Sequence, residues 1–172
     1  RGRGDRGVLG ADRPGGGRLS DPALARRVHD YLGAHRVVTL ATCDAVGPWA
    51  AAVYYAHEAS TLYFLSSPAS RHARHIEADG RVAATIQSDA TEWTQITGLQ
   101  LEGRARRLGA AEAAPARLLY GAKFPFVGAL AKAPAALREA LARVNWYAFA
   151  VERACLIDNR LGFGHRDELR YG

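Results

Sequence analysis

The sequence predicts a mainly β fold, a six-stranded antiparallel barrel with short helices between some of its strands. Two observations lead to this prediction. Short segments of alternating apolar and polar residues recur along the chain, as in strands that bury one face. The first three of these segments are joined by only a few residues, which suits antiparallel neighbours and not the helical crossovers of a parallel sheet. A closed or partly closed barrel accommodates such strands.

Composition divides the chain into a tail and one domain. The 172 residues, 48% of them hydrophobic, are enough for a single domain with a sizeable core. We expect residues 1–19, which are rich in Gly and Arg, to form a disordered tail and residues 20–172 to form the folded domain. Residues 1–27 hold seven arginines and three aspartates, so this leading segment carries +4 of the net charge of +6. This distribution weakens a nucleic-acid-binding interpretation of the domain.

The first half of the domain predicts one leading helix and four strands. Ser20 or Asp21 caps the helix, Pro22 lies in its first turn, and Gly33 is a plausible end. Strands are predicted over residues 37–44, 49–58, 61–67 and 81–89, with a short helix over 68–80 before the fourth strand.

The second half predicts two further strands with helices between them. Gly98 and Gly103 lie inside the fifth strand and indicate bends, bulges or a close backbone approach. Tyr147, Phe149 and Val151 alternate along the sixth strand and should share one face. Strands are predicted over residues 95–109 and 146–158, helices over 110–124 and 133–144, and an irregular, glycine-rich ending over 159–172.

Cysteine usage and apolar runs predict the compartment. Cys43 and Cys155 are the only cysteines, and we expect both to be buried free thiols in a reducing cytosol. No apolar run approaches the roughly 20 residues of a membrane span, and the N-terminus lacks the order of a signal peptide. The prediction is a cytoplasmic protein without membrane contact.

Hydrogen-bond donors are concentrated in the stretch SSPASRHARHIE, where a strand runs into a helix. Ser67 followed by Pro68 is typical of a helix start, and a helix N-terminus is a natural anion site. Ser66 and Ser70 add hydroxyl donors, and Arg71 adds a guanidinium fork that suits phosphate. The stretch therefore predicts a site for a phosphate monoester. The alternative is a capped surface helix whose arginines face water.

Three stretches resemble the pyridoxamine 5′-phosphate oxidase-like FMN-binding split barrel, most closely its YhbP-like subgroup. They are LYFLSSPASRHARHIE, ITGLQLEGRARRL and LIDNRLGFGH, and the last is the most specific for the subgroup. The resemblance runs from about Ala25 to Leu169. It implies a homodimer with FMN in a groove at the subunit interface.

The resemblance also implies which residues hold the cofactor. In the oxidase pattern, a strand that ends in a hydroxyl residue precedes a Ser-Arg-Lys triplet that binds the FMN phosphate. Ser66 takes the hydroxyl position, with Ser67 beside it, and Ser70 and Arg71 match the Ser and the Arg. His72 replaces the Lys, so the charge at that position depends on pH.

Other positions depart from the oxidase pattern. The Arg and Lys that contact the flavin from the preceding strand correspond to Ala50 and Tyr55, and a Gln of the oxidase corresponds to Gly98. The C-terminal Arg-His substrate motif has no clean counterpart in GFGHRDEL. A vitamin B6 oxidase activity is therefore not expected. The small side chains of Ala50, Ala51 and Ala52 would let a planar ring lie against the strand, and tight core packing explains them equally well.

Aromatic residues and the C-terminal loop supply further candidates. Tyr54 and Tyr55 are adjacent, so one can reach the cofactor groove while the other packs. The tryptophans can stack on a flavin, close a dimer interface or pack in the core or rim. For the glycine-rich C-terminal loop, the resemblance favours a role on the side of the cofactor. The residues concerned are Trp49, Trp93, Trp146, Asn159, Arg160 and His165.

Several functions remain open. The first is an FMN-dependent oxidoreductase of unknown substrate, in which the flavin performs hydride and electron transfer. A close variant uses the deazaflavin F420 on the same fold, and a non-catalytic flavin- or haem-binding module is a further alternative. Nucleic-acid binding through the basic tail would be weak and steeply salt-dependent. His72 and His75 lie at helical spacing without a third metal ligand placed by the sequence, so no metal site is predicted.

Overall fold

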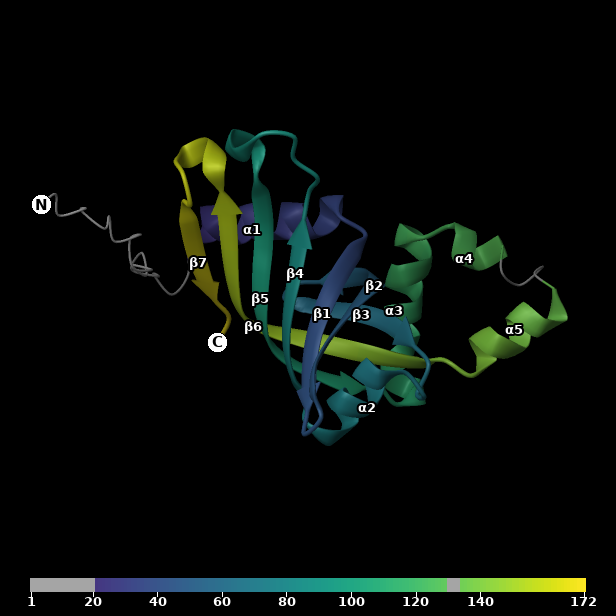
Figure 1. Ribbon diagram of the computed structural model, residues 1–172. Coiled ribbons are helices and arrows are strands. Elements are labelled where there is room, and N and C mark those ends of the chain that lie inside the picture. The colour runs from purple at the N-terminus through teal and green to yellow at the C-terminus, as the bar shows by residue number, and fades with distance from the viewer. Residues whose placement is uncertain (1–20, 130–133) are drawn as a thin grey trace, which may run out of the picture.

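The protein is an antiparallel β-barrel with helices packed around it (Figure 1). The computed structural model describes residues 21–129 and 134–172, so the predicted tail lies outside the described residues. The strand order is β3-β2-β1-β4-β5-β6-β7, and an extra pairing of β3 with β6 closes the first six strands into a ring. The predicted six-stranded barrel is thus confirmed. The strands are β1 Val37–Asp44, β2 Gly47–Glu58, β3 Thr61–Ser66, β4 Arg81–Gln87, β5 Thr97–Arg107, β6 Asn145–Asp158 and β7 Arg166–Arg170.

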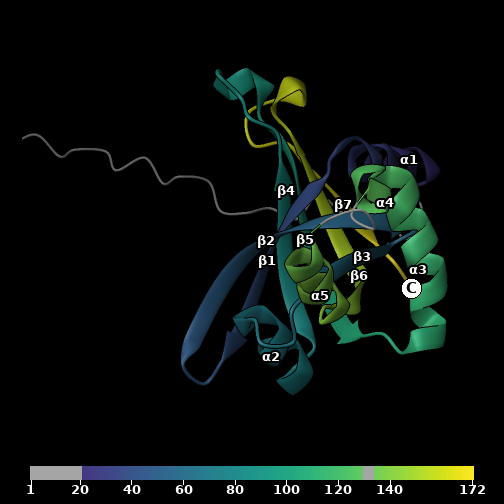
Figure 2. The same ribbon diagram turned by 90° about the vertical axis from the view of Figure 1, so that its right-hand side faces the viewer.

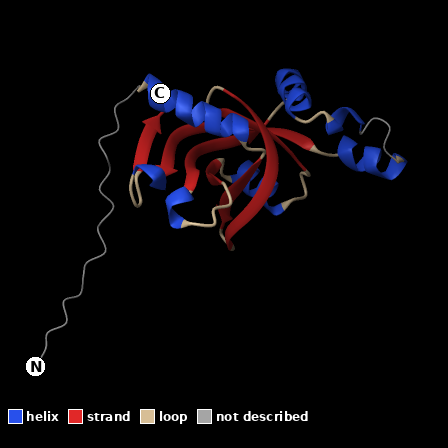
Figure 3. Ribbon diagram, turned by 90° about the horizontal axis from the view of Figure 1, so that it is seen from above, coloured by secondary structure: helices blue, strands red, loops and turns tan. Residues whose placement is uncertain are grey.

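The helices gather on different sides of the barrel. Figure 3 shows α1 lying across one side and α3, α4 and α5 grouped beyond the other end of the sheet. The carboxylate of Asp21 caps α1 by accepting hydrogen bonds from the backbone N–H groups of Ala23 and Leu24 at 2.9 and 3.3 Å. No helix in the described part of the chain is long and apolar enough to cross a membrane. The helices are α1 Pro22–Ala34, α2 Arg71–Ala78, η1 Trp93–Gln95, α3 Ala110–Lys123, α4 Phe126–Ala129, α5 Ala135–Ala142 and η3 Asn159–Leu161.

The barrel interior is filled by the inward-facing side chains of its strands. Tyr147, Phe149 and Val151 are all buried, which confirms the predicted apolar face of β6. The ring of Tyr147 stacks on that of Phe64 from β3, with centroids 5.3 Å apart. This contact lies directly across the pairing that closes the barrel, so the closure is also a packed part of the core.

Gly103 is the site of a close backbone approach, one of the possibilities that the sequence indicated for the fifth strand, and the bulge itself lies opposite it on β6. The register between β5 and β6 shifts after Glu102, which leaves Glu152 as the extra residue on β6. A Cβ atom at Gly103 would lie 2.1 Å from the carbonyl oxygen of Ala150. The close approach of the two backbones therefore requires glycine at this position.

Small side chains cover the outer face of β1, β2 and β4. Ala41 of β1 pairs with Ala50 of β2 and with Ala83 of β4, and Ala52 follows on the same side of β2. All four alanines are exposed. Cys43 is also exposed on β1, so the predicted burial of this free thiol is wrong, because its side chain points out of the barrel.

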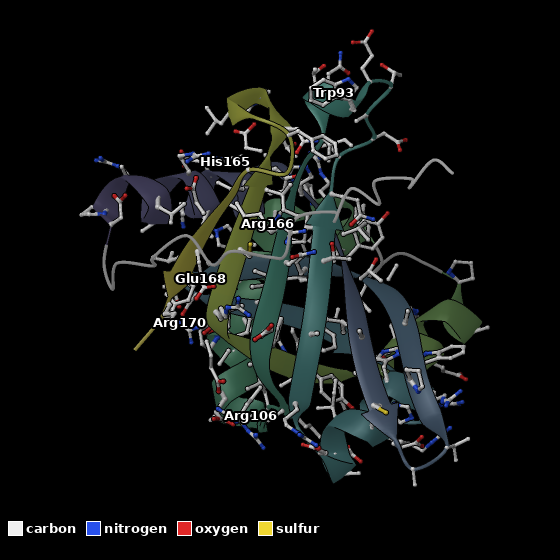
Figure 4. All side chains as sticks on the ribbon, turned by 60° about the vertical axis from the view of Figure 1, so that its left-hand side comes forward. Trp93, Arg106, His165, Arg166, Glu168 and Arg170 are labelled. Atoms are coloured by element: carbon white, nitrogen blue, oxygen red, sulfur yellow. The ribbon has the colours of Figure 1, made fainter. Side chains whose placement is uncertain are left out.

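A seventh strand, β7, lies where the sequence predicted an irregular ending. It pairs with β6, and Figure 4 shows Arg166, Glu168 and Arg170 following one another along it. Arg153 of β6 contacts Glu168 at 2.6 Å, and Glu168 also contacts Arg170 at 2.8 Å. Ion pairs dominate this strand and Leu169 is its buried apolar residue. Apolar alternation is therefore absent from this strand, and the sequence pattern did not indicate it.

Candidate cofactor site

The donor-rich stretch forms a tight turn followed by α2. The backbone N–H of Ser70 donates to the carbonyl oxygen of Ser67 at 3.0 Å and closes the turn. Ser70 has extended backbone angles and caps α2, its Oγ accepting a hydrogen bond from the N–H of Ala73 at 3.3 Å. The helix start expected at Ser67 and Pro68 is therefore wrong. The extended conformation of Ser70 delays the helix until Arg71.

Ser66, Ser70 and His72 form a hydrogen-bonded set that we call the Ser–His triangle. The Oγ of Ser66 lies 2.9 Å from the Oγ of Ser70 and 2.6 Å from the Nε2 of His72, and the Oγ of Ser70 lies 3.2 Å from the same nitrogen. Burial, with the nearby charge of His75, lowers the pKa of His72, so its ring is neutral at neutral pH. Each member of the triangle can donate a hydrogen bond to a phosphate oxygen.

Arg71 leaves the same turn but points towards the β1–β2 hairpin, which lies beside α2 (Figure 2). Its Nη2 donates to the carbonyl oxygen of Gly47 at 3.3 Å and lies 3.8 Å from Oδ1 of Asp44. Its guanidinium carbon lies 5.1 Å from the ring centroid of Trp49, and its Nε donates to the Nε2 of His75 at 3.3 Å. Within the described structure, the polar contacts of Arg71 are thus separate from those of the Ser–His triangle.

His75 is the centre of a second network that sequence reasoning missed. Its side chain is 2% exposed. Its Nδ1 lies 3.0 Å from the Oγ1 of Thr42, and its Nε2 lies 3.0 Å from the Oδ2 of Asp44. His72 and His75 therefore serve different networks, and no cluster of three metal-ligating side chains occurs in the residues that the structure describes. The four-residue spacing from Arg71 to His75 was the sequence signal for their contact.

A pocket of about 770 Å³ opens beside Ser66, within the roughly 300–1,000 Å³ typical of small-molecule sites. Aromatic rings form much of its wall, and those of Tyr120 and Trp146 meet edge to face with centroids 5.4 Å apart. Arg117 and Arg138 are the charged side chains among the described lining residues. The lining residues are Tyr54, Leu65, Ser66, Ser67, Arg117, Tyr120, Phe126, Val127, Arg138, Leu141, Ala142, Val144 and Trp146.

The three alanines of the predicted site divide between two faces of β2. Ala50 and Ala52 are exposed on the outer face, whereas Ala51 points to the opposite side, because side chains alternate along a strand. Tyr54 continues the outer row and lines the pocket. The adjacent Tyr55 is fully buried, which confirms that one of the two tyrosines packs in the core, whereas a role for Tyr54 in a cofactor groove stays a prediction.

Gly98 lies far from the Ser–His triangle within one chain. It pairs with Ile157 near the end of β6, whereas Ser66 pairs with Asn145 at the start of that strand. At roughly 3.3 Å per residue, about 40 Å of strand separates the two pairs. The structure therefore does not bring Gly98 to the residues with which it was grouped.

The tryptophans occupy three different environments. Trp146 lines the pocket, and Trp49 lies under the guanidinium of Arg71. Trp93 lies at the far tip of the sheet, where its ring meets that of Phe163 with centroids 5.7 Å apart. Only the first two are placed near the donor-rich stretch.

The C-terminal loop packs against that same far tip, where Figure 4 labels Trp93 and His165. The Nδ2 of Asn159 donates to the carbonyl oxygen of Trp93 at 2.8 Å, and Arg160 contacts Asp158 at 2.7 Å. These contacts hold the loop in place at the end of β6. A cofactor-side role for the loop stays a prediction.

Comparison with known proteins assigns the family. Residues 24–154 match the family model described as pyridoxamine 5′-phosphate oxidase. The chain belongs to this family. Among its relatives, the UPF0306 protein YhbP of Salmonella arizonae is 30% identical over 138 residues, which cover 79% of this chain and 86% of that protein.

Solved structures of other proteins share the fold. A haem-binding protein from Mycobacterium smegmatis superposes with a TM-score of 0.66 at 23% identity, covering 88% of this chain and 60% of that one. A FAD-binding protein from Mesorhizobium loti superposes with a TM-score of 0.59 at 20% identity, covering 76% of this chain and 89% of that one. These likenesses confirm the split-barrel fold.

Proposed function

We propose that this protein binds FMN and acts as a flavin-dependent oxidoreductase. The observation that carries the proposal is the Ser–His triangle, which gathers two hydroxyls and an imidazole at the start of α2. A helix N-terminus favours anions, and each member of the triangle can donate to a phosphate oxygen. Arg71 adds a permanent positive charge in the same turn.

The pocket beside the triangle fits the remaining part of a flavin. Leu65, Tyr54 and Trp146 offer apolar and aromatic surface next to Ser66 and Ser67, as a planar ring requires. Burial raises the pKa of Tyr120 to about 12, so its phenol stays neutral in the wall. The residues present therefore fit both ends of the cofactor, a phosphate and a ring.

When bound, the flavin would supply hydride or electron transfer. The residues of the chain would bind and orient it. The hydroxyls of Ser66, Ser67 and Ser70 would hold the phosphate with Arg71 and His72, while the aromatic wall shields the ring from water. In this arrangement none of the named side chains acts as an acid or base, so the site is a binding site first.

We further propose a homodimer that joins through the outer face of β1, β2 and β4. Exposed alanines there would allow two sheets to approach closely. A partner chain would also give Gly98 and the C-terminal loop, which lie far from the triangle of their own chain, a route to the cofactor. Light scattering should give the mass of a dimer, and Ala83→Arg should yield a monomer. A monomeric wild-type protein would contradict this proposal.

Two other ligands, F420 and haem, are each supported by one observation. Arg117 and Arg138 in the pocket would suit the acidic tail of F420. The structural likeness to a haem-binding protein favours haem, in a protein without turnover. Incubation of equal protein samples with FMN, F420 and haem, followed by gel filtration, compares their retention directly.

The absorption spectrum of the purified protein tests the proposed function. We expect flavin bands in the near-ultraviolet and blue, with FMN released on denaturation or taken up when added. Retention of F420 or haem in place of FMN would move the assignment to that ligand. A protein that retains none of the three would contradict all these assignments.

A further inference from the structure

His75 is built into the site but cannot touch a ligand. It lies on α2 one turn after Arg71, its side chain is 2% exposed, and both ring nitrogens already have partners. Thr42 of β1 holds Nδ1, and Asp44 at the hairpin holds Nε2. Any effect of His75 on a ligand must therefore pass through another residue.

The Asp44 carboxylate fixes this network to the hairpin. Its Oδ1 accepts the backbone N–H groups of Val46 and Gly47 at 3.0 and 3.1 Å, and its Oδ2 faces His75. The hairpin backbone thus holds Oδ1, and Oδ2 faces the imidazole on α2. The helix and the hairpin meet through the imidazole of His75 and the guanidinium of Arg71.

Whether Nε2 of His75 carries a proton determines which neighbour is its hydrogen-bond partner. With a proton, Nε2 donates to Asp44; without one, it accepts from the Nε of Arg71, and Thr42 can complement either tautomer through its hydroxyl. In both cases Arg71 remains beside Asp44 and over Trp49. The guanidinium is therefore held on several sides at once.

An arginine that is held before its ligand arrives loses less side-chain entropy on binding. The Nε and Nη2 of Arg71 face the hairpin network, while the side chain is 32% exposed and its Nη1 has no hydrogen bond to any described residue. The held guanidinium thus keeps one donor edge for an incoming anion.

We propose that His75, together with Asp44, is a positioning residue that fixes Arg71 and thereby gives the site its preference for a phosphorylated flavin over an unphosphorylated one. This inference rests on the proposed function, because it concerns the phosphate of the same cofactor. His75 sets the discrimination without contacting the flavin. Riboflavin, which lacks the phosphate, is the natural reference ligand.

The test measures the dissociation constants of FMN and riboflavin by quenching of flavin fluorescence. His75→Asn keeps a polar atom near the position of Nδ1 and removes Nε2, whereas His75→Gln restores a polar atom near Nε2. We expect His75→Asn to reduce the FMN-over-riboflavin preference about three- to tenfold and His75→Gln to recover part of it. In the Arg71→Ala background, His75→Asn should cause no further loss, because its effect passes through Arg71.

Two results would overturn the positioning role: equal weakening of FMN and riboflavin by His75→Asn, or additive losses in the double variant. Asp44→Asn retains the oxygen that binds the hairpin N–H groups and removes the charge. Asp44→Asn should also lower the preference for FMN over riboflavin. If His75→Asn does not fold, this variant tests the positioning role, and an unchanged preference would overturn it. A wild-type protein that binds FMN no more tightly than riboflavin would instead contradict the proposed function itself.

Discussion

The Nε2 of His72 lies 2.6 Å from the Oγ of Ser66. This contact joins the end of β3 to the first turn of α2, the two elements between which a phosphate would be held. His72 stands where the resemblance places a permanently charged lysine. The site therefore combines one fixed charge, on Arg71, with one that depends on protonation.

FMN binding should tighten as the pH falls from about 8 to about 6.5. Burial, followed by the charge of His75, lowers the pKa of His72, so the ring is neutral at the upper pH. A bound phosphate would favour the imidazolium, so that binding takes up a proton. Fluorescence titrations across this range measure the effect. Riboflavin should show no such dependence, and His72→Lys should flatten the curve for FMN; a flat curve for the wild-type protein would contradict the prediction.

Arg71→Ala should weaken FMN binding by about 1.5 to 3 kcal/mol, the scale of a charge-assisted hydrogen bond. Isothermal titration calorimetry measures the change. Arg74→Ala is the matched control, because Arg74 lies on the same helix, is exposed and bonds the carbonyl oxygen of Ala69. An unchanged dissociation constant for Arg71→Ala would remove Arg71 from the phosphate site.

The stability of the fold should fall as the pH falls from about 6.5 to about 4. Burial, then the charges of His29 and Lys123, lowers the pKa of His57 to about 4. In the unfolded chain this histidine titrates near 6.5, so the unfolded chain binds the proton more readily over that range. Protonation therefore stabilises the unfolded state relative to the folded one and lowers the free energy of unfolding. Urea denaturation at several pH values tests this. His57→Gln should flatten the dependence, and an identical slope in both proteins would exclude His57 as its cause.

Gly103→Ala should destabilise the fold by about 3 kcal/mol, because the added methyl group has no room beside the backbone of Ala150. Gly121→Ala provides the contrast. Gly121 lies within α3, and nothing lies within 4 Å of an added Cβ atom there, so alanine should stabilise the helix by about 0.5 to 1 kcal/mol. Thermal unfolding of both variants compares the two effects. Equal stabilities would show that β5 and β6 can separate at the bulge.

The local alternation of apolar and polar residues was sufficient to predict most strands of the barrel. The first strand was predicted over the residues that form β1, because alternation and a turn define its ends. β2 begins at Gly47, two residues before its predicted start, because the carboxylate of Asp44 accepts the N–H groups of Val46 and Gly47 and tightens the turn. The close backbone approach at Gly103 was one of the possibilities foreseen, since glycine inside a strand is unusual.

The candidate site was only partly predictable. Ser66, Ser70 and His72 are close in sequence, so their meeting at one turn could be anticipated. The contact of Arg71 with Asp44 depends on how the hairpin packs on α2, which residues 27 positions apart do not reveal by spacing. The pocket wall likewise requires Trp146, which reaches Ser66 only through the pairing of β3 with β6.

That pairing has a consequence for the order in which the protein is made. Ser66 lies opposite Asn145, about eighty residues later in the chain, so the ring of strands closes only after a long loop has been brought together. On the ribosome, the triangle and α2 leave the exit tunnel well before the strand that completes their surroundings. A flavin would therefore meet its full site only near the end of synthesis, and loading is expected to be post-translational.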